Sequence, residues 1–82
     1  MSEANRRHEA TLATTHDDAR TVAAALAPDN TDAMTTTVDG DTIRTTIVRE
    51  DAGGLAASVD DYVVNLTVAD AVCETARDTT QP

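Results

Sequence analysis

The sequence contains no Phe, no Trp and no Lys, and it has only one Tyr and one Cys among its 82 residues. Without large aromatic side chains the chain has no platform on which nucleic-acid bases could stack. With a single thiol, Cys73, no internal disulfide can form and a cysteine-based metal site is not expected. No apolar run is long enough for a membrane helix, and no signal peptide or lipidation motif is present. We therefore expect a cytoplasmic protein.

Large aliphatic side chains are also scarce, with four Leu, two Ile and eight Val. This length fits one small domain, and such a core stabilises a free monomer only marginally. Association with another protein would stabilise the fold by covering more apolar surface. We predict a single domain at residues 8–75, with flexible tails at 1–7 and 76–82.

The charge balance is strongly acidic: fifteen acidic residues, eleven of them Asp, face six Arg, and the net charge is −9. Fifteen Thr residues add a short, well-hydrated surface. This composition is typical of proteins from salt-loving organisms, where a Debye length of about 3 Å at molar salt screens self-repulsion. We expect a protein from a halophilic organism, and the alternative is an ordinary acidic domain. In a halophile, acidity does not exclude contact with RNA.

The hydrophobic periodicity predicts five elements in the order β-α-β-β-α. Asp17 is the expected cap of the first helix, Pro28 ends that helix, and Asp39-Gly40 predicts a hairpin because Gly accepts the positive φ of the turn. Residues 51–54 end the third strand and lead into the last helix. The expected elements are a strand at 8–15, a helix at 19–27, strands at 34–39 and 41–50, and a helix at 55–74.

These elements predict an α+β fold, a two-layer sandwich in which two helices cover one face of a three-stranded antiparallel sheet. If the third strand lies in the middle, the first strand pairs antiparallel to it and the first helix crosses over one face. The other sheet face is expected to be polar and open to water. It carries Thr11, Thr35, Thr37, Arg44, Thr46 and Val48.

The last helix is apolar on two opposite sides, which is the most informative feature of the chain. One stripe holds Leu55, Val59, Tyr62, Leu66, Ala69 and Cys73, and the opposite stripe holds Ala57, Val64, Val68, Ala71 and Val72. A surface helix needs only one apolar stripe for its own core. The second stripe predicts a surface that another protein covers. The alternative is that this stripe is exposed and idle, since isolated exposed Val is normal.

Two neighbouring segments carry a resemblance to a known family. They are Ile43-Arg44-Thr45-Thr46-Ile47 and Leu55-Ala56-Ala57-Ser58-Val59-Asp60-Asp61-Tyr62-Val63-Val64-Asn65-Leu66. Together with the element order and length, they resemble the small Pcc-type subunit of the KEOPS complex, called EKC in eukaryotes. Family members carry a basic residue where this chain has Ala56, and an Asn-Ser pair where it has Asp60-Asp61.

The resemblance implies an accessory, dimerisation subunit without catalytic activity or cofactor, in a complex that threonylcarbamoylates adenosine 37 of tRNA. In the family this subunit docks its helices on the catalytic subunit, which has an actin-like ATPase fold. It also self-associates, bridges two complexes and contributes to tRNA binding. On this basis we assign the docking surface to Val22, Leu26, Ala57, Asp61, Val64, Val68, Ala71 and Val72.

The homodimer interface is assigned to the edge of the first strand, at Thr11, Leu12, Ala13 and Thr14. Thr favours strands, and no Pro or Lys blocks this edge. Arg6, Arg7 and Arg44 are the candidate RNA contacts. The alternative function is a stand-alone KH-like RNA-binding module, although the Gly-x-x-Gly clamp of such modules is absent.

An enzyme is not expected, because the sequence shows no nucleophile–base pair, metal-ligand set or phosphate-binding loop. His16-Asp17-Asp18 could suggest a metal or acid–base site. A metal site needs three or four converging ligands, so capping of the first helix is the preferred interpretation.

Overall fold

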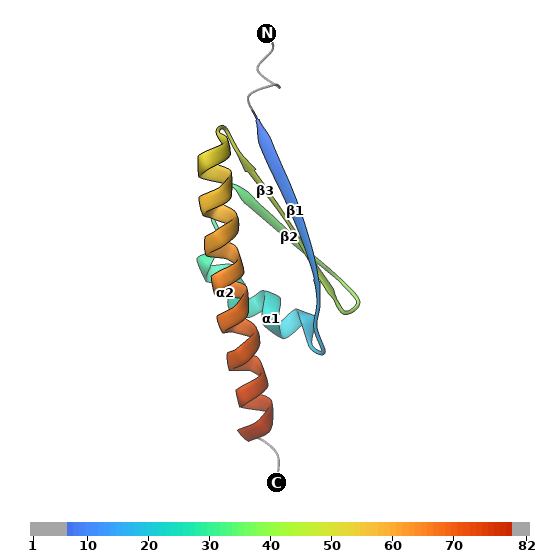
Figure 1. Ribbon diagram of the computed structural model, residues 1–82. Coiled ribbons are helices and arrows are strands. Elements are labelled where there is room, and N and C mark those ends of the chain that lie inside the picture. Colours follow the sequence, from blue (N-terminus) through green and yellow to red (C-terminus); the bar gives the residue numbers. More distant parts are fainter. Residues whose placement is uncertain (1–6, 80–82) are drawn as a thin grey trace.

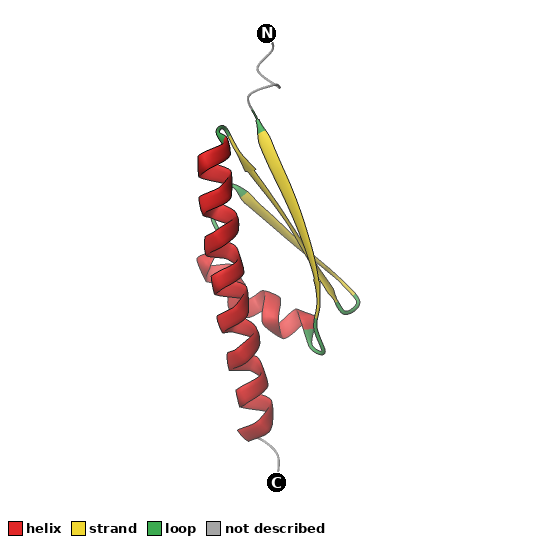
Figure 2. Cartoon of the chain, viewed as in Figure 1, coloured by secondary structure: helices red, strands yellow, loops and turns green. Residues whose placement is uncertain are grey.

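The computed structural model describes residues 7–79, with side chains described as far as residue 76. The elements follow in the predicted order, as Figure 2 shows by secondary-structure type. They are β1 (His8–Thr15), α1 (Ala19–Leu26), the short 3₁₀ helix η2 (Ala27–Asp29), β2 (Met34–Asp39), β3 (Thr42–Arg49) and α2 (Ala52–Thr79).

The three strands form an antiparallel sheet in the order β1-β3-β2, so the third strand is central and β1 pairs antiparallel to it, as expected for that arrangement. Thr11 pairs with Thr46 on one side of β3, and Thr35 pairs with Thr46 on the other. The β2–β3 hairpin turns at Gly40, whose φ of 62° is the left-handed conformation that favours glycine. This confirms the Asp39-Gly40 turn.

Both helices pack on one face of the sheet, which gives the predicted α+β sandwich (Figure 1). Alternate residues of β1 are half-buried and exposed, as expected for a strand with one covered and one open face. The open face carries the predicted threonine-rich set, and the hydroxyls of Thr11 and Thr46 are hydrogen-bonded across it at 3.0 Å. Because its side chains are polar, this face of the sheet can remain in contact with water and needs no covering layer.

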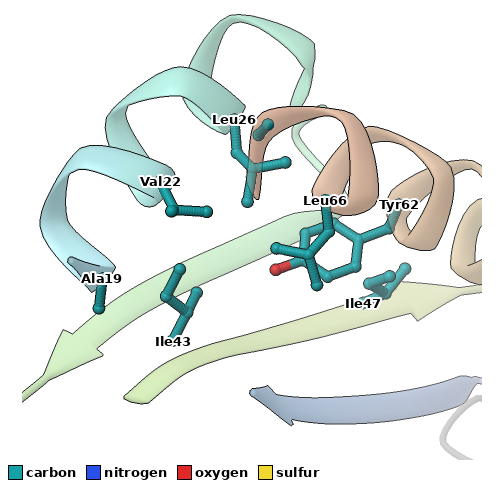
Figure 3. Packing of buried hydrophobic residues seen from close by; sticks show 8 residues of the cluster. Ala19, Val22, Leu26, Ile43, Ile47, Tyr62 and Leu66 are labelled. Carbon is teal, nitrogen blue, oxygen red and sulfur yellow. The ribbon is translucent and has the colours of Figure 1, made fainter. Parts of the chain in front are cut away.

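The core lies between the sheet and the two helices, and Figure 3 shows how side chains of α1, β3 and α2 converge there. Leu55, Val59 and Cys73 of α2 pack against its rim. The predicted inner stripe of this helix is therefore confirmed. The buried apolar residues are Ala19, Val22, Leu26, Ile43, Ile47, Tyr62, Leu66 and Ala69.

A chain of hydrogen bonds runs through this core from the η2–β2 loop to α2. Asn30 Nδ2 donates to Thr36 Oγ1 at 3.1 Å, and the hydroxyls of Thr36 and Thr45 are 2.9 Å apart. The fully buried Thr45 hydroxyl is in turn 2.7 Å from the hydroxyl of Tyr62. Because buried hydroxyls are costly without partners, this network fixes the position of α2 over β3 and β2.

Several predicted boundaries are wrong by one to five residues, including both ends of the third strand, which was expected at 41–50 and spans Thr42–Arg49. Asp18, rather than Asp17, caps α1, with its carboxylate accepting from the backbone N and the hydroxyl of Thr21. α1 ends at Leu26, and a 3₁₀ turn containing Pro28 follows it.

The last helix begins before Gly53 and Gly54 rather than after them, because Asp51 caps it. The Asp51 carboxylate accepts from Gly54 N at 2.5 Å, and its carbonyl accepts from Leu55 N at 3.0 Å. α2 then continues to Thr79, so the predicted tail at 76–79 is helical. The rest of both predicted tails, 1–6 and 80–82, lies outside the described residues.

Candidate docking surface

α2 presents an apolar stripe on the side that faces away from the sheet. Val64, Val68 and Val72 keep 56%, 57% and 59% of their surface exposed. Ala57 and Ala71 on the same side are exposed as well. We call these five residues the valine face. Single exposed valines are common, but a row of three on one helix is an apolar surface that water covers poorly.

Beside the valine face lies a groove of about 310 Å³ between α2 and the η2–β2 segment. Asp61 and Val64 belong both to the predicted surface and to the wall of this groove. The other lining residues are Asp29, Thr31, Met34, Arg49, Ser58 and Asn65. The sequence pattern did not identify the groove, because its two walls come from segments about thirty residues apart in the chain.

Arg49 is held at one end of this groove. Its Nη1 donates to Ser58 Oγ at 2.6 Å, and Ser58 is itself buried. A Cβ placed on Gly54 would lie 3.2 Å from Nη2 of Arg49, so the guanidinium fits closely against the first turn of α2. Arg49 thus joins the end of β3 to α2, which the sequence alone did not reveal.

The assignment of Val22 and Leu26 to the docking surface is wrong. They are 2% and 0% exposed, and both belong to the core cluster of the chain itself. Their i, i+4 spacing is the same for a core stripe and for a docking stripe. Both side chains are buried in the small core of the chain, so neither is exposed to a partner.

The edge of β1 is free of any neighbouring strand among the described residues, because β1 is terminal in the sheet. His16 N donates to Asp41 O at 2.8 Å toward β3. Donors alternate between the two sides of an antiparallel strand, so the backbones of Thr11 and Ala13 point outward. Leu12 and Thr14 direct their backbones toward β3 instead, with half-buried side chains.

The candidate RNA contacts are not brought together. Arg44 is exposed on the open face of the sheet, between Ala13 of β1 and Thr37 of β2. Arg7 is exposed and lines an open cleft that also contains Arg49. Asp32 and Glu50 line the same cleft, so its charges balance. Arg6 lies outside the described residues.

His16 joins the end of β1 to α2. Its Nδ1 donates to Asp70 Oδ1 at 2.9 Å, and its Nε2 is hydrogen-bonded to the Thr14 hydroxyl at 2.7 Å. The side chain of His16 is 7% exposed and that of Asp70 is 45% exposed. Asp18 is used in capping, and no group of metal ligands occurs among the described residues. This arrangement is a structural link between two elements distant in sequence.

In comparisons with known proteins, no family model, no curated protein and no solved structure matches this chain. Among the described residues, no helix is both long enough and apolar enough to span a membrane.

Proposed function

We propose that this chain is a non-catalytic accessory subunit of a KEOPS-type complex that threonylcarbamoylates adenosine 37 of tRNA. It binds the actin-like catalytic subunit through the valine face of α2. The proposal is supported by the resemblance of residues 43–47 and 55–66 to the small subunit of that complex. The single structural observation that carries it is the exposure of Val64, Val68 and Val72 on a helix whose opposite side already fills the core.

The energetics favour a docking role for this face. Full burial of an exposed Val side chain is worth about 1.5–3 kcal/mol before the costs of ordering are subtracted, and these three valines have a little over half of their surface left to bury. Three such side chains in one row can act as the central contacts of an interface, although buried area alone does not set affinity. The alanines at 57 and 71 allow a partner helix to approach α2 closely.

A homodimer bridging two complexes is part of the same proposal. The outward backbone groups of Thr11 and Ala13 offer a row of donors and acceptors to the β1 strand of a second copy. The edge and the valine face belong to different elements, so the chain can use both at once. Binding of tRNA is then a property of the assembled complex rather than of the isolated chain.

Val68→Asp tests the docking role. The substitution places a charge in the centre of the valine face, where burial against a partner would be strongly unfavourable. We expect the variant to lose co-purification with the catalytic subunit in molar KCl. Val63→Asp is the matched control, because Val63 is 41% exposed on the same helix but lies about 140° around the axis.

Retention of the catalytic subunit by Val68→Asp would show that this face is not the docking surface. A gel shift on tRNA adds a second readout: the isolated chain should bind weakly, and addition of the catalytic subunit should increase binding. Strong binding by the isolated chain would favour the KH-like module instead.

A further inference from the structure

Two exposed carboxylates lie beside Val64 on α2: Asp60 is at the edge of the valine face, and Asp61 is within it, between Val68 and Val72 around the helix axis. At 100° per residue, Val64 lies between them, about 40° from Asp60 and about 60° from Asp61. Both aspartates are exposed, and neither makes a side-chain hydrogen bond or ion pair within the described part of the chain. The valine face thus has one available negative charge at its edge and one within it.

The groove next to the valine face carries further negative charge. Asp29 and Asp61 both line it, and its single cation, Arg49, already donates to Ser58. Close packing against Gly54 keeps the Arg49 guanidinium at the first turn of α2. The surface around Asp61 therefore attracts cations more than anions.

Residues on the outer side of α2 also have the sequence spacing at which one helix packs along another, and we call this row the seam. Intervals of four and three residues alternate along it from residue 57 to residue 75, as in the contact positions of a coiled coil. The seam is about 27 Å long, which a single straight helix can cover. Its positions are Ala57, Asp61, Val64, Val68, Ala71 and Thr75.

A second copy of this chain is a poor occupant of the seam. α2 carries five acidic residues, Asp60, Asp61, Asp70, Glu74 and Asp78, against one cation, Arg77. In a parallel pair of α2 helices, Asp61 would face Asp61. In an antiparallel pair centred on Val68, Asp61 would lie opposite Thr75 and next to Glu74. Either arrangement brings ten carboxylates together against two copies of Arg77, so repulsion between like charges predominates.

We propose that the seam is occupied by one helix of a different protein, with small apolar residues against the valines and Arg or Lys at the positions that face Asp60 and Asp61. Asp60 and Asp61 select this helix by pairing with those cations. The inference rests on the proposed function, in which the helix belongs to the catalytic subunit. It adds the chemistry of the partner surface, which the valines alone do not specify.

The test compares two double variants that each remove two carboxylates. Asp60→Asn with Asp61→Asn acts at the seam. Asp39→Asn with Asp41→Asn is the control, since both of its residues are exposed at the β2–β3 hairpin. The affinity of each full-length variant for the purified catalytic subunit is measured in 0.5 M and 3 M KCl, with circular dichroism as a check of folding.

We expect the seam variant to bind about 3- to 30-fold more weakly than the wild type in 0.5 M KCl. The difference should shrink in 3 M KCl, because salt screens exposed charge pairs. The hairpin variant should bind like the wild type. Equal affinity of the seam variant and the wild type, or equal weakening of both variants, would overturn the inference and leave the proposed function standing.

Sedimentation of the isolated chain tests whether a second copy occupies the seam. If the wild type forms a dimer that Val68→Asp dissociates, a second copy occupies the seam and the inference is wrong. If the wild type does not bind the catalytic subunit in either salt, the proposed function fails, and the assignment of the partner helix fails with it.

Discussion

At the scale of single residues, Tyr62 shows how a core with so few large side chains becomes specific. Its ring is buried among the aliphatic residues of the core, while its hydroxyl reaches the buried Thr45. One side chain therefore contributes both apolar area and the last hydrogen bond of a polar network. Because Phe and Trp are absent, Tyr62 carries the only benzene ring of the chain.

Tyr62→Phe should lower the free energy of unfolding by about 1–2 kcal/mol, because the Thr45 hydroxyl then loses one of its two buried partners. Urea unfolding at fixed protein concentration in molar KCl measures this change. Thr46→Val is the control, since its hydroxyl bond to Thr11 lies on the open face and should contribute less than about 0.5 kcal/mol. An equal effect of the two substitutions would contradict a special role of the buried network.

At the scale of elements, β1 and α2 each pack one side against the core and leave another side exposed to a partner. The half-buried residues of β1 face the core, and its outer backbone edge has no strand beside it in the described chain. α2 buries Tyr62, Leu66 and Ala69, and it exposes the valine face on its other side. These two free features lie on different elements, so one chain can contact two partners.

Ala13→Pro should convert a homodimer to a monomer, because proline removes the outward N–H of β1 without removing a hydrogen bond to β3. Analytical ultracentrifugation in molar KCl checks the mass. Val38→Pro is the matched control: by the same alternation its backbone points outward from β2, and it should leave the dimer intact. A dimer that survives Ala13→Pro but dissociates on Val38→Pro would place the interface on the other edge.

At the scale of the whole molecule, the net charge of −9 on 82 residues works against the compact state. Most acidic side chains are exposed, and the apolar core is small. The balance between repulsion and burial should therefore depend on salt. This follows from composition and does not depend on the function proposed above.

Raising KCl from 0.1 M to 2 M should raise the midpoint of thermal unfolding, because the Debye length falls from about 10 Å to below about 3 Å. Circular dichroism at fixed protein concentration measures the midpoint. A variant with Asn at the exposed positions Asp32, Asp39, Asp41 and Asp60 should show a smaller rise. If salt leaves the wild-type midpoint unchanged, the halophilic interpretation of the composition is wrong.

Periodicity and turn chemistry alone determined the order of elements, the hairpin at Gly40 and the inner stripe of α2. These features are local or follow from pairing rules, so they can be read from neighbouring residues. The start of α2 was missed because Gly53 and Gly54 disfavour a helix, and the Asp51 cap outweighs that preference.

Only the tertiary structure decided which apolar side chains remain outside. Val22, Leu26, Val64 and Val68 all show helical spacing, yet the first two are buried and the last two are exposed. Spacing defines a face of a helix but does not say what lies against it. The His16–Asp70 link and the groove at Asp61 likewise depend on segments distant in the chain. Contacts of this kind exist only once α2 is packed across the sheet.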